Sequence, residues 1–209
     1  IAMDAGANSG DGSFILSNYV GRDGLVLSFE PHPYYFLATK RAIQLSLRKN
    51  ILLKNIALTS KKRKVNFAIS QNNKDLDYLS KVLDDTNISN NFKTIQISGD
   101  TIDNLSKKIK LPVSLLKIDV EGHEFDVIKG SVNTIKKYFP IIVFEVNNDI
   151  NGIQNFNYIK EFLSEFGYKL YHLDKNLKPI EYYNYEDLPP TDCHDILALP
   201  TSNKNKLAN

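Results

Sequence analysis

Short apolar runs alternate with longer amphipathic stretches along most of the chain. Runs with few polar interruptions predict buried strands, and they occupy Gly24–Phe29, Val113–Val120 and Ile141–Val146. Leu, Ile, Ala and aromatic residues recur at helical spacing in Phe36–Leu47 and Phe125–Tyr138, which predicts two amphipathic helices. The chain therefore reads as strands and helices in alternation.

The same periodicities predict the remaining elements. They are strands at Ile1–Ala5, Ile51–Leu58, Val65–Ile69 (at a sheet edge), Tyr168–Leu173 and Asp195–Leu199, and helices at Ser13–Val20, Thr101–Lys110 and Tyr158–Phe166. Thr101 is expected to cap the helix that follows it, and Gly167 is expected to end the last helix. Residues 71–92 are polar and rich in Asn and Asp, which predicts a loop or a covering segment.

Strands that are apolar on both faces need helices on both sides, and strand–helix alternation produces a parallel sheet with crossover connections. The pattern therefore predicts a doubly wound, Rossmann-like α/β fold. No repeat or linker divides the chain, so we expect one domain over residues 1–200 and a polar tail over residues 201–209. The chain starts inside an apparent strand, and we expect that a segment preceding residue 1 has been removed.

Composition narrows the classes of function. The 209 residues carry a net charge of +2, which is too small to indicate nucleic acid as a partner. The single cysteine excludes a disulfide framework within the chain and fits a reducing compartment. No apolar run is long enough to span a membrane, and no signal peptide is visible. We therefore expect a cytoplasmic protein without a membrane span.

The loop after the first strand, DAGANSG at Asp4–Gly10, suggests a ligand site. Gly6 and Gly10 permit a tight turn and close approach of a ligand to the backbone. The loop lacks the G-x-G-x-x-G pattern of dinucleotide sites, and Asp4 would repel a pyrophosphate but attract an ammonium group. This favours S-adenosylmethionine, which carries an ammonium and a sulfonium, over NAD.

A carboxylate at the end of the second strand supports the same ligand. Glu30 ends the run LVLSFE, at the place where a carboxylate can accept hydrogen bonds from both ribose hydroxyls. Pro31 and Pro33 delay the next helix and hold the end of the strand open as a loop.

Ionisable residues gather where the Val113–Val120 strand ends. Lys117 and Asp119 share one face of the strand and could pair, so that Lys117 is either a structural counter-ion or a catalytic group. The turn that follows carries Glu121, Glu124 and His123, and Glu145 ends the next strand. Such convergence at one sheet edge is typical of an active site, although strand-end ion pairs and helix N-terminal carboxylates give the same pattern.

Four motifs of this chain together resemble the FkbM family of S-adenosylmethionine-dependent methyltransferases. They are DAGANSG, FEP at residues 29–31, NIAL at residues 55–58 and LLKIDVEGHEFDVIKG at residues 115–130. The resemblance implies a class I methyltransferase fold with a seven-stranded, mostly parallel sheet and an antiparallel last strand. It also implies O-methylation of a hydroxyl on a sugar, glycan or small-molecule natural product.

The loop arguments and the resemblance lead to one set of site residues. The cofactor-binding residues are expected to be Asp4, Gly6, Ala7, Asn8, Gly10, Glu30, Pro31, Ala57 and Asp119, and the catalytic residues Asp119, Glu121 and Glu124, with His123 as the next candidate. Methyl transfer requires alignment of the acceptor oxygen and one general base. No metal is expected, although Asp119, Glu121 and Glu145 could in principle hold Mg²⁺.

Two other functions stay open at this point. An NAD-linked oxidoreductase would use the same architecture, but Asp4 and the missing third glycine count against it. A cofactor-binding domain that has lost catalysis, or one domain of a larger assembly, would keep the same loops.

Overall fold

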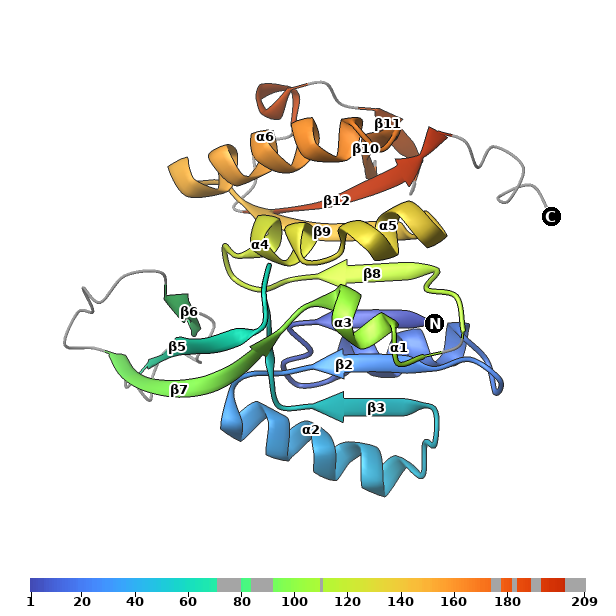
Figure 1. Cartoon of the computed structure of the whole chain (residues 1–209), viewed down its shortest axis with the longest axis vertical. Coiled ribbons are helices and arrows are strands. Elements are labelled where there is room, and N and C mark those ends of the chain that lie inside the picture. The colour runs from blue at the N-terminus through green and yellow to red at the C-terminus, as the bar shows by residue number, and fades with distance from the viewer. Residues whose placement is uncertain are drawn as a thin grey trace.

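Two β-sheets and their helices make up the computed structural model, which describes residues 1–70, 80–83, 92–109, 111–173, 178–181, 184–188 and 193–201 (Figure 1). The larger sheet has eight strands in the order β11-β10-β12-β9-β8-β1-β2-β3. They are β1 (Ala2–Ala5), β2 (Val26–Phe29), β3 (Ile51–Lys54), β8 (Leu115–Ile118), β9 (Ile141–Asn147), β10 (Tyr168–Leu173), β11 (Pro179–Glu181) and β12 (Cys193–Pro200).

The directions of the strands confirm the predicted fold class. β3, β2, β1, β8 and β9 pair in parallel, and β12 lies antiparallel between β9 and β10. The last strand is thus the reversed one, as the family resemblance implies. The sheet also has an eighth strand, β11, which pairs antiparallel with the outer edge of β10.

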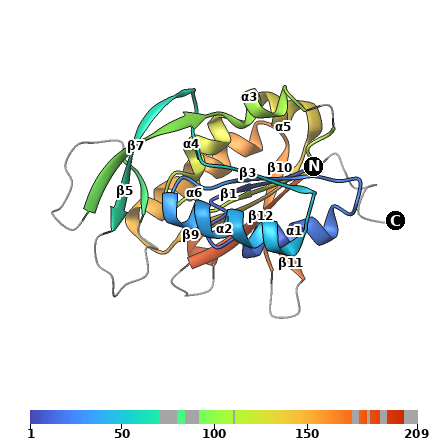
Figure 2. The ribbon, with the colours of Figure 1, turned by 90° about the horizontal axis from the view of Figure 1, so that it is seen from below.

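Helices cover both faces of this sheet (Figure 2). One face carries α3 (Ile102–Ser106), α4 (Glu124–Lys129), α5 (Val132–Tyr138) and α6 (Ile150–Ser164). The other face carries α1 (Asp11–Tyr19) and α2 (Pro33–Ser46). A short 3₁₀ helix spans Tyr185–Asp187. The main apolar core lies on the α3–α6 side, where Ile142, Phe144 and Val146 of β9 are buried together with Phe156 and Ile159 of α6.

The contact between α1 and the sheet is polar. Only Ser13 and Ser17 of α1 are buried. The Ser13 hydroxyl donates to Asp4 Oδ2 at 2.6 Å and lies 2.7 Å from the hydroxyl of Ser28. Lys117 Nζ lies 3.4 Å from Asp4 Oδ1, so a fully buried carboxylate of β1 is neutralised from β8. Asp4, Ser13, Ser28 and Lys117 form what we call the polar seam.

In the polar seam, burial and the neighbouring charges shift the pKa values of Asp4 and Lys117 in opposite directions. Burial raises the pKa of Asp4, and the Lys117 ammonium and the Ser13 hydroxyl act in the opposite direction. Burial alone would lower the pKa of Lys117, but the Asp4 and Asp119 carboxylates raise it overall. The seam therefore depends on keeping its cation and its buried carboxylate together.

A second, four-stranded sheet stands beyond the carboxyl ends of the main strands (Figure 1). Its order is β4-β7-β5-β6, with β4 at Ala57–Leu58, β5 at Arg63–Ser70, β6 at Lys81–Leu83 and β7 at Phe92–Asp100. A small core of its own contains Ala57, Val65, Phe67, Val82 and Ile97.

This second sheet corrects two predictions. The strand expected over Ile51–Leu58 is divided into β3 and β4, which belong to different sheets. The division falls at Asn55, whose side-chain amide donates to the carbonyls of Glu30 and Pro31 and so holds the chain across the end of β2. The predicted edge strand at Val65–Ile69 is instead an inner strand, since β5 pairs with both β6 and β7.

Several helix boundaries also differ from those predicted from the sequence. The helix expected over Phe125–Tyr138 is two helices, α4 and α5, which are separated at Gly130 and Ser131. The chain at Gly130 passes so close to Thr59 that a Cβ there would lie 2.2 Å from the Thr59 carbonyl oxygen. Thr101 caps α3 as predicted, with its hydroxyl accepting from the Asn104 N–H at 3.0 Å, but α3 ends at Ser106. The strand β7 was not anticipated. Of the expected loop over residues 71–92, residues 71–79 and 84–91 lie outside the described part of the chain.

Among the described residues, no helix is long and apolar enough to cross a membrane.

The polar seam makes a first prediction. Lys117→Met removes the cation that neutralises buried Asp4 and should lower the free energy of unfolding by about 3–5 kcal/mol, measured by urea denaturation. The double variant Asp4→Asn/Lys117→Met removes both charges and should recover part of that loss. Lys107→Met, at an exposed position, is the control. A loss in Lys117→Met no larger than in the control would contradict the role of the seam.

Candidate functional site

A pocket of about 260 Å³ opens at the carboxyl ends of the main strands. Its lining comes from the loops after β1, β2, β3 and β8, from Glu145 of β9, from the start of α2 and from the second sheet. The lining residues are Gly6, Asn8, Phe29, Glu30, Pro31, His32, Tyr35, Ile56, Ala57, Leu58, Phe67, Ser80, Val82, Asp119, Val120, Glu121, His123 and Glu145. This is the edge of a doubly wound sheet at which ligands bind.

The loop after β1 is wedged between the ends of its two neighbouring strands. The backbone N–H groups of Gly6 and Ala7 both donate to the Phe29 carbonyl at 3.0 Å. Gly6 has a φ of +77°, and a Cβ there would lie 1.7 Å from the carbonyl oxygen of Asp119. Glycine is therefore needed at this position by the packing of β1 against β8, before any ligand is considered.

Glu30 forms part of the pocket wall and is held by backbone groups. Its Oε2 accepts the Asn8 N–H at 2.6 Å, and its Oε1 accepts the His32 N–H at 2.7 Å. Only 5% of the residue is exposed. Burial raises the pKa of Glu30 to about 7, against the effect of the two backbone hydrogen bonds. The carboxyl group thus ties the first two loops together and changes its charge near neutral pH.

The expected cofactor-binding residues divide into two groups. Gly6, Asn8, Glu30, Pro31, Ala57 and Asp119 line the pocket, whereas Asp4, Ala7 and Gly10 are not in its lining. Asp4 faces Lys117 and Ser13 in the polar seam. The argument that its carboxylate attracts an ammonium group therefore finds no support in this geometry.

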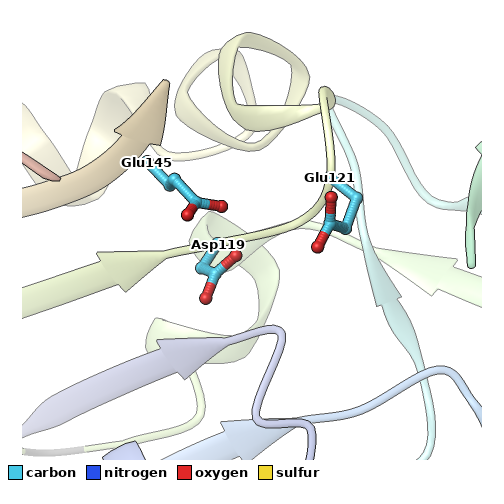
Figure 3. A group of neighbouring side chains, drawn as sticks. All are labelled: Asp119, Glu121 and Glu145. Atoms are coloured by element: carbon cyan, nitrogen blue, oxygen red, sulfur yellow. The ribbon is translucent and has the colours of Figure 1, made fainter. Parts of the chain in front are cut away.

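Three carboxyl groups meet at the ends of β8 and β9 (Figure 3). Asp119, Glu121 and Glu145 each offer one oxygen, and these oxygens lie within 4.8 Å of one another. We call these three residues the acidic cluster. Lys117 Nζ lies 3.2 Å from Asp119 Oδ2, so the predicted pairing of these two side chains is present. The cluster is thereby joined to the polar seam.

Burial and mutual repulsion alter the titration of the acidic cluster. The pKa of Glu121 is raised to about 7, first by burial and then by the charges of Asp119, Glu145 and Glu124. The pKa of Glu145 is also raised to about 7, first by burial and then by Asp119, while a hydrogen bond with Cys193 opposes the rise. Carboxyl groups with such values can exchange a proton at neutral pH.

Glu124 occupies a different position from the acidic cluster. It is buried and does not line the pocket. Its Oε1 accepts the Val120 and Gly122 N–H groups at 3.2 and 3.1 Å, and its Oε2 accepts the Asn155 side-chain amide at 2.6 Å. Burial raises the pKa of Glu124. These contacts hold the turn that places Glu121 in the pocket, where the Glu121 backbone has a φ of +53°.

The pattern of the sequence did not indicate several lining residues. His32 and Tyr35 come from the start of α2, and Phe67, Ser80 and Val82 come from the second sheet. Alternating apolar residues mark β5 as a strand, but nothing in the sequence says which surface that strand covers. His123, the next catalytic candidate from the sequence, does line the pocket.

Comparison with protein families gives a match over most of the chain. A sequence model described as the methyltransferase FkbM domain matches residues 4–170. This range includes the loops after β1, β2, β3 and β8 and the part of β9 that line the pocket. No curated protein matches the chain at a significant level.

Solved structures share the fold. The methyltransferase FkbM from Methylobacillus flagellatus KT has a TM-score of 0.57 and 16% identity, over 95% of this chain and 42% of that one. A Clostridium thermocellum protein assigned as an rRNA methylase has a TM-score of 0.54 and 13% identity, over 95% and 84% of the two chains. A Streptococcus mutans protein assigned as a methyltransferase, in complex with SAH, has a TM-score of 0.52 and 10% identity, over 95% of this chain and 86% of that one.

The chain thus spans less than half of the length of the Methylobacillus structure.

The contacts of Glu124 lead to a second prediction. Glu124→Gln replaces charge-assisted hydrogen bonds by neutral ones and places an N–H₂ group against the Asn155 amide, which has to turn its oxygen to accept it. The change should lower the free energy of unfolding by about 1–3 kcal/mol. Thermal and urea denaturation measure this loss. Glu165→Gln, at the exposed position that follows α6, should leave stability unchanged. A Glu124→Gln variant as stable as the unmodified protein would contradict this structural role.

Proposed function

This chain belongs to the FkbM methyltransferase family, and from that membership we propose that it transfers a methyl group from S-adenosylmethionine to a hydroxyl group. The acceptor that we propose is a sugar, a glycan or a small-molecule natural product.

The observation that carries the proposal is the placement of Glu30. A carboxylate at the end of the second strand of a Rossmann-like sheet can accept hydrogen bonds from both ribose hydroxyls. Glu30 lies at that position, in the pocket wall, and its orientation is set by the Asn8 and His32 N–H groups. Because each carboxylate oxygen has more than one lone pair, both oxygens retain capacity for a ribose hydroxyl.

The charge of the pocket supports a cationic cofactor. Four carboxyl-bearing residues line it: Glu30, Asp119, Glu121 and Glu145. Within the described part of the chain, no Lys or Arg is among the lining residues. Such a pocket suits the ammonium and sulfonium of S-adenosylmethionine and disfavours the pyrophosphate of NAD, which would bring two negative charges.

The cofactor supplies a methyl group that its sulfonium already activates. The protein then has to align the acceptor oxygen and take up its proton. We assign the proton to Glu121, which lines the pocket and has a pKa of about 7. Glu145 is less suited, because it already interacts with Asp119 and Cys193.

Asp119 is proposed to lie beside the methionine part of the cofactor. Its backbone carbonyl packs directly against Gly6 in the first loop. Its carboxylate faces the pocket while one oxygen is paired with Lys117. This pairing fixes the orientation of the carboxylate before ligand binds.

The proposed cofactor can be tested without knowledge of the acceptor. Isothermal titration with S-adenosylhomocysteine should show one site per chain, and NAD should not compete for it. Incubation with methyl-labelled S-adenosylmethionine and a panel of monosaccharides and oligosaccharides then tests transfer. Tighter binding of NAD would favour an oxidoreductase. Cofactor binding without transfer to any hydroxyl compound would favour a non-catalytic binding domain.

The titration of Glu30 gives a third prediction. Only the ionised carboxylate can accept both ribose hydroxyls, so affinity for S-adenosylhomocysteine should fall below pH 7, approaching about tenfold per pH unit. Glu30→Gln should bind more weakly at pH 8, by about 1.5–3 kcal/mol. Its affinity should depend less steeply on pH, and the remaining dependence comes from Glu121 and Glu145, which line the same pocket and have pKa values of about 7. Calorimetry from pH 5.5 to about pH 8 measures both effects. Equal pH profiles for the two proteins would remove Glu30 from the site.

The assignment of the base gives a fourth prediction. Glu121→Gln should transfer methyl groups about 10²–10⁴-fold more slowly, a loss much larger than any weakening of S-adenosylhomocysteine binding. In the unmodified protein, the rate should rise with pH through about 7, because the base must be ionised. Glu161→Gln, on the exposed side of α6, is the control. A fully active Glu121→Gln variant would show that another group is the general base, and His123 is the next candidate.

A further inference from the structure

Helix α2 presents apolar side chains to solvent. One stripe along the helix advances by steps of three or four residues and consists of Tyr34, Leu37, Arg41 and Leu45. Its three apolar residues Tyr34, Leu37 and Leu45 are 68%, 62% and 68% exposed. Only Thr39 of α2 is buried. A surface helix usually turns its apolar stripe toward the core, so α2 carries apolar surface where packing does not require it.

The residue that caps α2 adds to this surface. Leu47 has a φ of +57° and is 83% exposed. Gly or Asn is favoured at a left-handed cap, because other side chains are strained there. The backbone therefore gains nothing from a leucine at this position, and its side chain makes the exposed surface more apolar.

The same part of the chain is basic. Between residues 31 and 54 the sequence contains no Asp or Glu, and its basic residues are Lys40, Arg41, Arg48, Lys49 and Lys54. All of them except Arg48 are exposed. Helix α2 lies beside β3, the edge strand of the larger sheet, at one end of the molecule (Figure 1). The small net charge of the whole chain thus conceals a local concentration of positive charge.

The apolar and basic residues of α2 and its cap form one surface. We call it the basic–apolar face, and it consists of Tyr34, Leu37, Lys40, Arg41, Leu45, Leu47 and Lys49. Helix α1 adjoins its far end, because Arg48 Nη1 donates to the side-chain oxygen of Asn18 at 2.7 Å. Tyr19, the neighbour of Asn18 in the sequence, is also exposed.

We propose that the basic–apolar face binds the surface of a lipid bilayer that contains anionic phospholipids. Leu and Tyr side chains of an interfacial helix enter the boundary between headgroups and acyl chains, while nearby Lys and Arg side chains are attracted to anionic headgroups. Such a helix lies in the plane of the membrane surface and does not cross it. This inference goes beyond the proposed function and does not rest on it.

The apolar side chains distinguish a bilayer from other anionic partners. Nucleic acid is bound mainly through ion pairs and hydrogen bonds to phosphates, and exposed leucines add nothing to such contacts. A second copy of the chain that paired through the same face would bring Lys40 and Arg41 of both copies together, and their like charges would repel. A bilayer with anionic headgroups suits both the leucines and the cations.

The basic–apolar face begins beside the pocket. His32 and Tyr35 line the pocket, and the ring of Tyr34 lies 5.5 Å from the ring of Tyr35, measured between centroids. A bilayer bound to this face is therefore next to the part of the pocket wall that the start of α2 supplies.

Sedimentation with lipid vesicles measures the proposed binding. We expect the protein to bind vesicles of phosphatidylcholine with about 30% phosphatidylglycerol at least tenfold more tightly than vesicles of phosphatidylcholine alone, a ratio of about 10. Raising the NaCl concentration from about 0.05 to about 0.5 M should weaken the binding, because salt screens the attraction between the cations and the headgroups.

Two double variants test the charges and the apolar side chains separately. Lys40→Glu/Arg41→Glu and Leu37→Ser/Leu45→Ser should each weaken binding to the anionic vesicles by about tenfold or more. The matched controls are Lys107→Glu/Lys108→Glu and Leu111→Ser/Ile150→Ser, which make equivalent changes at exposed positions on other parts of the chain. The controls should lose about threefold or less. Urea denaturation checks that all four proteins remain folded.

Several outcomes would overturn the inference. They include absence of binding to the anionic vesicles and equal losses in the variants and their controls. Binding of duplex DNA without binding of vesicles would assign the face to nucleic acid. A dimer in analytical ultracentrifugation that Leu37→Ser/Leu45→Ser abolishes, again without binding of vesicles, would assign it to a second copy. Because binding of S-adenosylhomocysteine is measured separately, failure here leaves the proposed function standing.

Discussion

The buried ion pair between Asp4 and Lys117 connects the parts of this molecule that form the pocket. Asp4 lies in β1 and Lys117 in β8, and the ammonium of Lys117 also reaches the carboxylate of Asp119. Ser13 of α1 completes the contacts of Asp4. Because an isolated buried carboxylate is costly, these elements are held in one arrangement. The loop that follows β1 and the acidic residue that follows β8 are consequently brought to the same edge of the sheet.

Carboxyl groups of one chemical type have distinct roles here because their surroundings differ. Asp4 is enclosed with a cation and a hydroxyl, and Glu124 is enclosed with three N–H donors. Glu30 and Glu121 face the pocket, and burial raises the pKa of each to about 7. The first pair stabilises the fold around the pocket, while the second pair is available to a ligand.

Much of this arrangement follows from local pattern, and the remainder depends on contacts distant in sequence. The strands and the loops at their carboxyl ends were predictable, because apolar runs and the glycine loop report local structure. The second sheet was not, since β5 acquires its partners from residues 81–83 and 92–100 and its position from packing. The close packing of Gly130 against Thr59 and the enclosure of Asp4 by α1 and β8 likewise depend on residues distant in sequence. Sequence order places Asp4 and Glu30 at strand ends but does not say that one is paired inside the fold and the other faces the pocket.

The central claim is that the carboxyl end of β2 receives the ribose of an S-adenosyl ligand. A structure of the protein with S-adenosylhomocysteine tests it most directly. We expect both ribose hydroxyls at about 2.6–3.0 Å from the carboxylate of Glu30, with the amino-acid part toward Asp119. A ligand bound elsewhere, or with its ribose away from Glu30, would contradict it.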